Sequence, residues 1–239
     1  MEIKKIMNEF IEESKEKLDL SCILQFGSST YTDDFEDIDL LFLSSHNVIP
    51  TKQNLELIRI VKDFENRYDD IVFDFGGVGT RDKEAKHSIT VVYLNKEHLN
   101  LEHNPHDLFF FKLLSEDKNI KTLYGVNPFE KMEINFTKQH LLEMLSVDLK
   151  RDILRNSLDD ENKLNEGLYC FFKGALRAML IHKGHFKKEE LLNEFQKEYG
   201  NKIRLPGNSE DIINHKIKKE DFEDILKFAE DCLRYLSEK

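Results

Sequence analysis

The spacing of apolar residues divides the chain into a mixed first part and a helical second part. Helical periodicity alternates with short, strand-like apolar runs in the first part and stands alone in the second. The helical stretches of the first part cover about 3–17, 54–68 and 105–114, and its strand-like runs cover 20–26, 37–43, 71–75, 88–94 and 120–124. The later helical stretches cover about 137–153, 160–183, 187–199 and 219–237.

Strands and helices that precede a purely helical region are typical of two domains. We expect an α/β (α+β) domain over residues 1–130, with a mixed β-sheet flanked by helices. An all-helical domain is expected over residues 131–239. Two helix starts carry favourable residues, because Pro105 suits a first helical position and Thr137 suits an N-cap.

The composition is that of an acidic globular protein. Of 239 residues, 40% are hydrophobic and 34% are charged, and the formal net charge is -11. Proteins that grip long nucleic acids usually present a basic face, so this balance argues against a general DNA or RNA binder. It is easier to reconcile with an enzyme that acts on a small, cationic or protein acceptor.

Cysteine usage and hydropathy indicate a cytoplasmic protein. Cys22, Cys170 and Cys232 are widely spaced and form no CxxC pair, so we expect neither a disulfide framework nor a zinc site. All three are predicted to be buried thiols. The charged, amphipathic first 17 residues do not resemble a signal peptide, and no apolar run approaches the length of a membrane span.

Two carboxylates in a strand-like run carry the first chemical signal. Asp37 and Asp39 stand two residues apart, so a strand presents both on one face while Ile38, Leu40 and Phe42 point to the other. Neighbouring carboxylates repel each other unless a cation offsets their charge. Mg²⁺ suits such a pair, because it binds one or two carboxylates together with water and substrate phosphates.

A glycine turn strengthens this signal. The first strand-like run ends at Gly27-Ser28, ten residues before Asp37. A glycine lets the backbone approach a phosphate closely, and the serine hydroxyl and exposed N–H groups can donate hydrogen bonds to it. Alone, either motif is weak, since Gly27 could merely end a strand and an Asp-x-Asp pair is usually a solvated surface feature.

Together, Phe26-Gly27-Ser28 and Asp37-Ile38-Asp39-Leu40 resemble the signature of the polymerase-β-like nucleotidyltransferase superfamily. The resemblance implies an enzyme that transfers a nucleoside monophosphate from a nucleoside triphosphate (NTP), with two Mg²⁺ ions. It also implies a third carboxylate on a later strand, which Asp74 matches within its apolar run. Asp70, at the opening end of that run, is the competing candidate.

Further features are similar to the antibiotic-modifying, small-substrate branch of the superfamily. The segment Leu123-Tyr124-Gly125 matches an element that commonly ends its catalytic domain, and a helical domain follows. The spacer before Asp37 departs from the pattern, since it lacks the Arg-Gly of the minimal antitoxin-type members. Glu36 stands where a Ser is often found.

The helical part contains one basic stretch. Residues 173–188 include five Lys or Arg and no acid, and Lys173 shares a helical stripe with Glu166 and Tyr169. The resemblance implies that a cation in this domain offsets the charge of the triphosphate. Lys173 is the candidate for this role, and the alternative interpretation is an ordinary solvated lysine on the helix surface. The glycines of residues 76–79 are more typical of a turn than of a phosphate cradle.

We therefore predict a metal-dependent nucleotidyltransferase. Asp37 and Asp39 would hold both Mg²⁺ ions, with Asp74 also a ligand, while Gly27, Ser28 and Lys173 would hold the triphosphate. The base would be Asp74 or Glu166. A small-molecule acceptor is favoured over tRNA or protein. The alternatives are a toxin–antitoxin or phage-defence enzyme that modifies tRNA or a protein, and a degenerate nucleotide-binding module.

Overall fold

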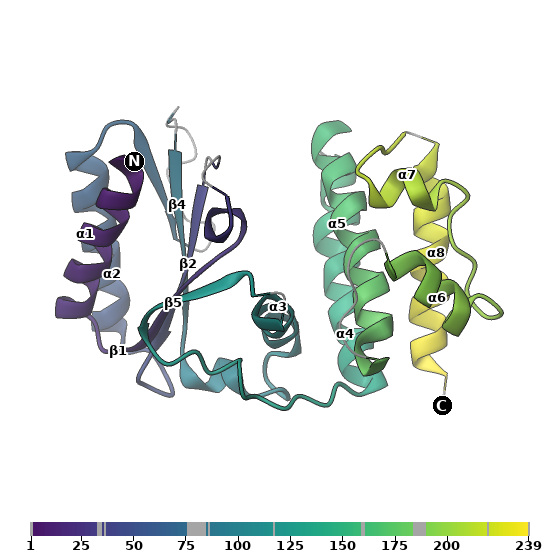
Figure 1. Cartoon of the computed structure of the whole chain (residues 1–239), viewed down its shortest axis with the longest axis horizontal. Coiled ribbons are helices and arrows are strands. Elements are labelled where there is room, and N and C mark those ends of the chain that lie inside the picture. The colour runs from purple at the N-terminus through teal and green to yellow at the C-terminus, as the bar shows by residue number, and fades with distance from the viewer. Residues whose placement is uncertain are drawn as a thin grey trace. The chain divides into compact units, whose positions relative to one another are not determined.

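The structure is a computed structural model that describes residues 2–32, 35, 37–75, 85, 87–116, 118–158, 161–183, 190–218 and 220–238. The chain divides into two compact units, Met1–Glu133 and Ile134–Lys239. Figure 1 shows the sheet in the first unit, and the described part of the second unit contains only helices and turns. The predicted class, a mixed sheet flanked by helices and followed by a helical region, is confirmed.

A mixed β-sheet organises the first unit. Its strands are β1 (Leu20–Phe26), β2 (Asp37–Ser44), β3 (Ile71–Phe75), β4 (His87–Leu94) and β5 (Ile120–Gly125). The order across the sheet is β3-β4-β2-β1-β5. Strands β2, β4 and β3 run parallel, and β1 is antiparallel to both of its neighbours. In the described residues, β3 and β5 therefore form the two edges.

Two amphipathic helices cover one face of this sheet. These are α1 (Glu2–Lys17) and α2 (Thr51–Arg67), which lie together on one side in Figure 1. Phe10 of α1 lies at their centre, with ring centroids 5.8 Å from Phe42, 5.2 Å from Phe64 and 5.0 Å from Phe73. Each buried Phe side chain contributes about 2–3 kcal/mol of hydrophobic stabilisation. Ile38 and Leu40 are fully buried in the same core, as the alternation predicted.

The other face is covered in part by α3 (Pro105–Glu116), which begins at the proline that the sequence indicated. Phe26 packs edge-on against Phe110 and Phe111, at centroid distances of 5.9 and 5.3 Å. The 3-10 turns η1 (Ser28–Thr30) and η2 (Lys96–Leu99) complete the described elements of this unit.

Gly125 ends β5 for a steric reason. Its φ is +71°, and a Cβ at this position would lie 2.1 Å from the carbonyl oxygen of Ser21 on β1. Only glycine allows β5 to approach β1 so closely in this conformation. The glycine of the Leu-Tyr-Gly segment is therefore a requirement of strand pairing.

The second unit packs its helices around aromatic side chains. Its elements are α4 (Lys138–Asp148), η3 (Leu149–Leu154), η4 (Asn156–Leu158), α5 (Glu161–Leu180), η5 (Ile181–Lys183), α6 (Leu191–Tyr199), α7 (Ser209–Ile213) and α8 (Asp221–Ser237). Phe228 of α8 lies 5.1 Å from Phe172 and 5.5 Å from Phe195, measured between ring centroids.

The helix starts and ends mostly follow the prediction. Thr137 caps α4, since its hydroxyl accepts a hydrogen bond from the His140 N–H at 3.2 Å. The stretch predicted to be one helix over 137–153 instead changes to π-helical geometry at Leu149. The short α7 carries too few residues to show a helical period, and the sequence did not predict it.

One expectation about the cysteines is wrong. Cys22 and Cys232 are buried, but Cys170 is exposed. Cys170 lies on the polar side of α5, with its sulfur 3.5 Å from the carboxylate of Glu166. Helical spacing places residues 166 and 170 on the same polar face of α5. The prediction of a buried thiol did not distinguish this polar face from the face that packs against other helices.

Among the described residues, no helix is both long enough and apolar enough to cross a membrane.

Two glycines of α5 are expected to respond oppositely to alanine. A Cβ at Gly174 would meet no atom within 4 Å, whereas a Cβ at Gly167 would lie 1.8 Å from the carbonyl oxygen of Asp152 in η3. Gly174→Ala should therefore raise the free energy of unfolding by about 0.5–1 kcal/mol. Gly167→Ala should lower it. Urea denaturation of both variants tests this, and a destabilised Gly174→Ala protein would contradict the described packing.

Candidate active site

The turn after β1 has a backbone conformation that requires glycine. Gly27 has φ +79° and ψ -165°, a combination that side-chain-bearing residues essentially never adopt. Its carbonyl oxygen accepts hydrogen bonds from the Thr30 N–H at 3.2 Å and from the Thr30 hydroxyl at 2.7 Å. The carbonyl of Ser28 accepts from the N–H groups of Tyr31 and Thr32, both at 3.1 Å. These bonds hold the turn in one shape.

Strand pairing brings this turn against Asp39. Phe26, the last residue of β1, is paired with Asp39 on β2, so Gly27 follows directly beside that carboxylate. A Cβ on Gly27 would lie only 2.5 Å from Asp39 Oδ2. The space next to Asp39 is therefore available only because residue 27 has no side chain.

The acidic pair is electrostatically strained. Burial, and to a smaller extent the nearby charge of Asp37, raise the pKa of Asp39 to about 6. Asp37 itself is exposed at the first position of β2. An ionised carboxylate in this position is costly without a compensating positive charge.

Asp74 lies farther away, on the edge strand β3. In the parallel register, Asp39 and Asp74 are each paired with Thr90 of β4, which therefore stands between them. The three residues form one row on the same face of the sheet. Two strand spacings separate the outer two, so their Cα atoms are about 10 Å apart. Side chains can narrow this distance, but Asp74 is not an immediate neighbour of the pair.

The row also shows residues that the sequence did not suggest. Thr90 lies between Asp39 and Asp74, and Ser88 is paired with Asp37 in the preceding row. Both are on β4, whose position between β2 and β3 cannot be read from local patterns. The rival candidate, Asp70, is exposed in the turn before β3. The glycines of residues 76–79 lie outside the described residues.

No cluster of three or more His, Cys, Asp or Glu side chains in the described ranges is arranged to hold a metal ion. The described acids therefore provide a close pair and a separate third carboxylate. A site of this kind leaves room for ligands from a substrate, such as phosphate oxygens.

The polar stripe predicted on α5 is a connected group within the second unit. Lys173 Nζ donates to the hydroxyl of Tyr169 at 3.2 Å and lies 4.5 Å from the centre of its ring. Tyr169 stacks on His215, with centroids 4.2 Å apart and planes 15° apart. His215 Nε2 in turn lies 2.6 Å from Glu166 Oε2. The predicted roles of Lys173 and Glu166 toward a nucleotide stay predictions.

Comparison with solved structures identifies the fold. The chain has a nucleotidyltransferase fold, as the sequence resemblance predicted. A solved structure similar to this chain is that of spectinomycin adenyltransferase AAD(9) from Enterococcus faecialis with ATP and spectinomycin. The TM-score is 0.53 and the identity 11%, over 97% of this chain and 99% of the other.

No protein-family profile matches this sequence, and no curated protein does so either. The structural likeness therefore defines the fold, and the chemistry must be argued from the side chains.

Proposed function

We propose that this protein is a nucleotidyltransferase that moves a nucleoside monophosphate from an NTP to an acceptor hydroxyl and releases pyrophosphate. One observation carries the proposal: the strained Asp39 carboxylate lies beside Asp37 and directly against the side-chain-free Gly27 turn. A triphosphate needs such a combination of a cation-binding pair and a close backbone approach.

The acidic pair fits Mg²⁺. Asp39 is half-buried and its pKa is raised to about 6 by burial and by Asp37, so a bound cation would favour its ionised form. Asp37 and Asp39 would hold the metal, and a second ion could share the same pair. When bound, Mg²⁺ would neutralise phosphate charge and polarise the reacting phosphoryl group. A metal-binding role for Asp74 stays a prediction.

The remaining residues bind and orient. The Gly27 turn would let the phosphates approach the backbone, while the Ser28 hydroxyl donates to them. Asp74, two strands away from Asp39 in the same row, would accept a proton from the acceptor hydroxyl. An in-line arrangement places the attacking hydroxyl and the leaving pyrophosphate on opposite sides of the reacting phosphorus. We assign the pyrophosphate side to the Gly27 turn and the acceptor side to Asp74.

The acceptor is proposed to be a small molecule. The similar adenyltransferase was solved with ATP and spectinomycin, and the chain's net charge of -11 is unfavourable for gripping tRNA. A hydroxyl-bearing, cationic small molecule suits an acidic protein better. ATP is the first NTP to test for the same reason of likeness.

The test is transfer of label from each of the four α-labelled NTPs, with Mg²⁺ or with EDTA, to a panel of acceptors. The panel contains spectinomycin, aminoglycosides, lincosamides, tRNA and cell extract. We expect label on a small-molecule acceptor with Mg²⁺ and none with EDTA or with the Asp39→Asn variant. Label found only on tRNA or on a protein would instead identify the defence-type activity. Transfer that is unchanged in Asp39→Asn would exclude the proposed site.

A further inference from the structure

The polar part of strand β4 matches the acidic part of strand β2 in position. In the parallel register, Ser88 is paired with Asp37 and Thr90 is paired with Asp39. Ser88 and Thr90 lie on the face of the sheet that carries the acids, because Ile89 between them is fully buried in the core on the other face. Each acid therefore has one hydroxyl-bearing residue as its direct neighbour on the next strand.

The match also ends where the acids end. The next residues of β2 on this face are Leu41 and Leu43, and their partners on β4 are Val92 and Leu94. Strand β4 lies between two parallel neighbours, and such strands usually carry apolar residues on both faces. On this face of β4, the hydroxyl groups are thus an exception to the apolar run, and the exception coincides with the acidic pair.

The chemistry of these groups suits contact with the water ligands of a cation. Paired strands lie about 4.8 Å apart, so the hydroxyl and the carboxylate of one pair can reach the same ligand. Mg²⁺ bound by one or two carboxylates keeps several water molecules, whose protons need acceptors. A hydroxyl can accept from such a water and donate a hydrogen bond at the same time. Ser88 and Thr90 are both partly exposed, so their hydroxyls are accessible to a ligand.

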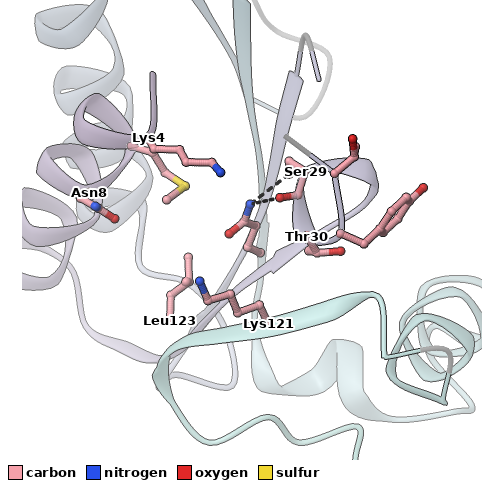
Figure 2. A pocket seen from close by; sticks show the side chains of 10 residues that line it. Lys4, Asn8, Ser29, Thr30, Lys121 and Leu123 are labelled. Carbon is pink, nitrogen blue, oxygen red and sulfur yellow. Dashed lines mark hydrogen bonds between the residues drawn. The ribbon is translucent and has the colours of Figure 1, made fainter. Parts of the chain in front are cut away.

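The turn after β1 directs hydroxyl groups to the opposite face of the sheet. Ser29 and Thr30 line a pocket of about 410 Å³ together with Lys4 of α1 and Lys121 of β5 (Figure 2). Gln25 points to the α1 face, and its amide nitrogen donates to the Ser29 carbonyl at 3.1 Å and to the Ser29 hydroxyl at 3.0 Å, as the dashed lines mark. Ser29 is therefore bound from the opposite face, whereas the β4 hydroxyls lie beside the acids.

We propose that Ser88 and Thr90 are positioning residues, whose hydroxyls hold water ligands of a divalent cation bound by Asp37 and Asp39. The inference rests on the proposed function, since it requires that the acidic pair binds a cation. Groups that hydrogen-bond to the ligands of a metal orient those ligands, and the loss of one such group typically lowers metal affinity by about ten- to a hundredfold. The β4 hydroxyls would thus determine how tightly the cation is held.

The test is titration of the full chain with Mn²⁺ in the absence of nucleotide, with free Mn²⁺ measured by electron paramagnetic resonance. Thr90→Val removes the hydroxyl but keeps the side-chain shape, and it should weaken Mn²⁺ binding by about tenfold or more. Thr90→Ser keeps the hydroxyl and should bind nearly as tightly as the parent. Ser88→Ala tests the neighbouring pair independently and should also weaken binding. Thr122→Val is the matched control, because Thr122 is an exposed threonine on the edge strand β5, and it should bind like the parent.

Circular dichroism of each variant shows whether it is folded, and Asp39→Asn should abolish binding at this site. The proposal alone is overturned if Asp39→Asn abolishes binding while Thr90→Val and Ser88→Ala bind as tightly as the parent. It is also overturned if Thr90→Ser loses as much affinity as Thr90→Val, since the hydroxyl would not be the cause. A parent that binds no Mn²⁺, or an Asp39→Asn variant that binds like the parent, would overturn this proposal together with the cation site of the proposed function.

Discussion

Asp39→Asn is expected to lower nucleotide transfer by a factor on the order of a thousand, without destabilising the protein above pH 6. The activity falls because the amide cannot replace a metal-binding carboxylate. The stability is preserved because burial and Asp37 make the ionised Asp39 side chain unfavourable in the folded state. The measurement pairs a transfer assay with urea denaturation. Loss of activity together with a gain in stability is typical of a functional residue held under electrostatic strain.

The stability gain should depend on pH with a definite sign. Asp39 has a folded pKa of about 6, above the ordinary aspartate value of 3.8, so the folded protein holds this proton more tightly than the unfolded chain. The parent therefore loses stability as pH rises from about 4 to about 6 through this group, by at most about 3 kcal/mol. Asp39→Asn lacks this loss. The difference between the two proteins should be largest above pH 6 and should vanish below pH 4.

Asp69→Asn is the control for this comparison, because Asp69 is an exposed turn residue just before β3. It should retain transfer activity and show the pH dependence of the parent. Mg²⁺ should raise the melting temperature of the parent but not that of Asp39→Asn, since a ligand stabilises only the folded form that binds it. Equal Mg²⁺ stabilisation of both proteins would place the metal elsewhere.

Gly27→Ala is expected to lower transfer activity by about a hundredfold, because it displaces the Asp39 carboxylate and reshapes the turn. A methyl group at this position would lie 2.5 Å from Asp39 Oδ2, so the carboxylate must move. The backbone at φ +79° and ψ -165° also penalises any side chain, by about 1–3 kcal/mol of stability. Transfer assays and urea denaturation measure the two effects separately.

Gly174→Ala is the matched control for this variant, since it adds the same methyl group where no atom lies within 4 Å. It should leave transfer unchanged per folded molecule. A Gly27→Ala protein that is destabilised but fully active would show that the turn is only structural. In that case the proposed approach of the triphosphate to Gly27 would be incorrect.

Local patterns were sufficient for much of the fold and for part of the site. The period-two alternation around Asp37 and Asp39 predicted that Ile38, Leu40 and Phe42 would be buried, and all three are. Thr137 and Pro105 were predicted to begin helices, and both do so. These features depend on neighbours within a few residues, so the sequence alone determines them. The roles proposed for the acids, Gly27, Ser28 and Lys173 still await experiment.

Only the tertiary structure decided which distant residues meet. The antiparallel pairing of β1 with β2 brings Gly27 against Asp39, whereas the insertion of β4 between β2 and β3 puts Thr90 between Asp39 and Asp74. Strand order and register arise from packing of the whole sheet, and no local period encodes them. For the same reason, only the tertiary structure shows that Lys4 and Lys121, more than a hundred residues apart in the chain, line the same pocket.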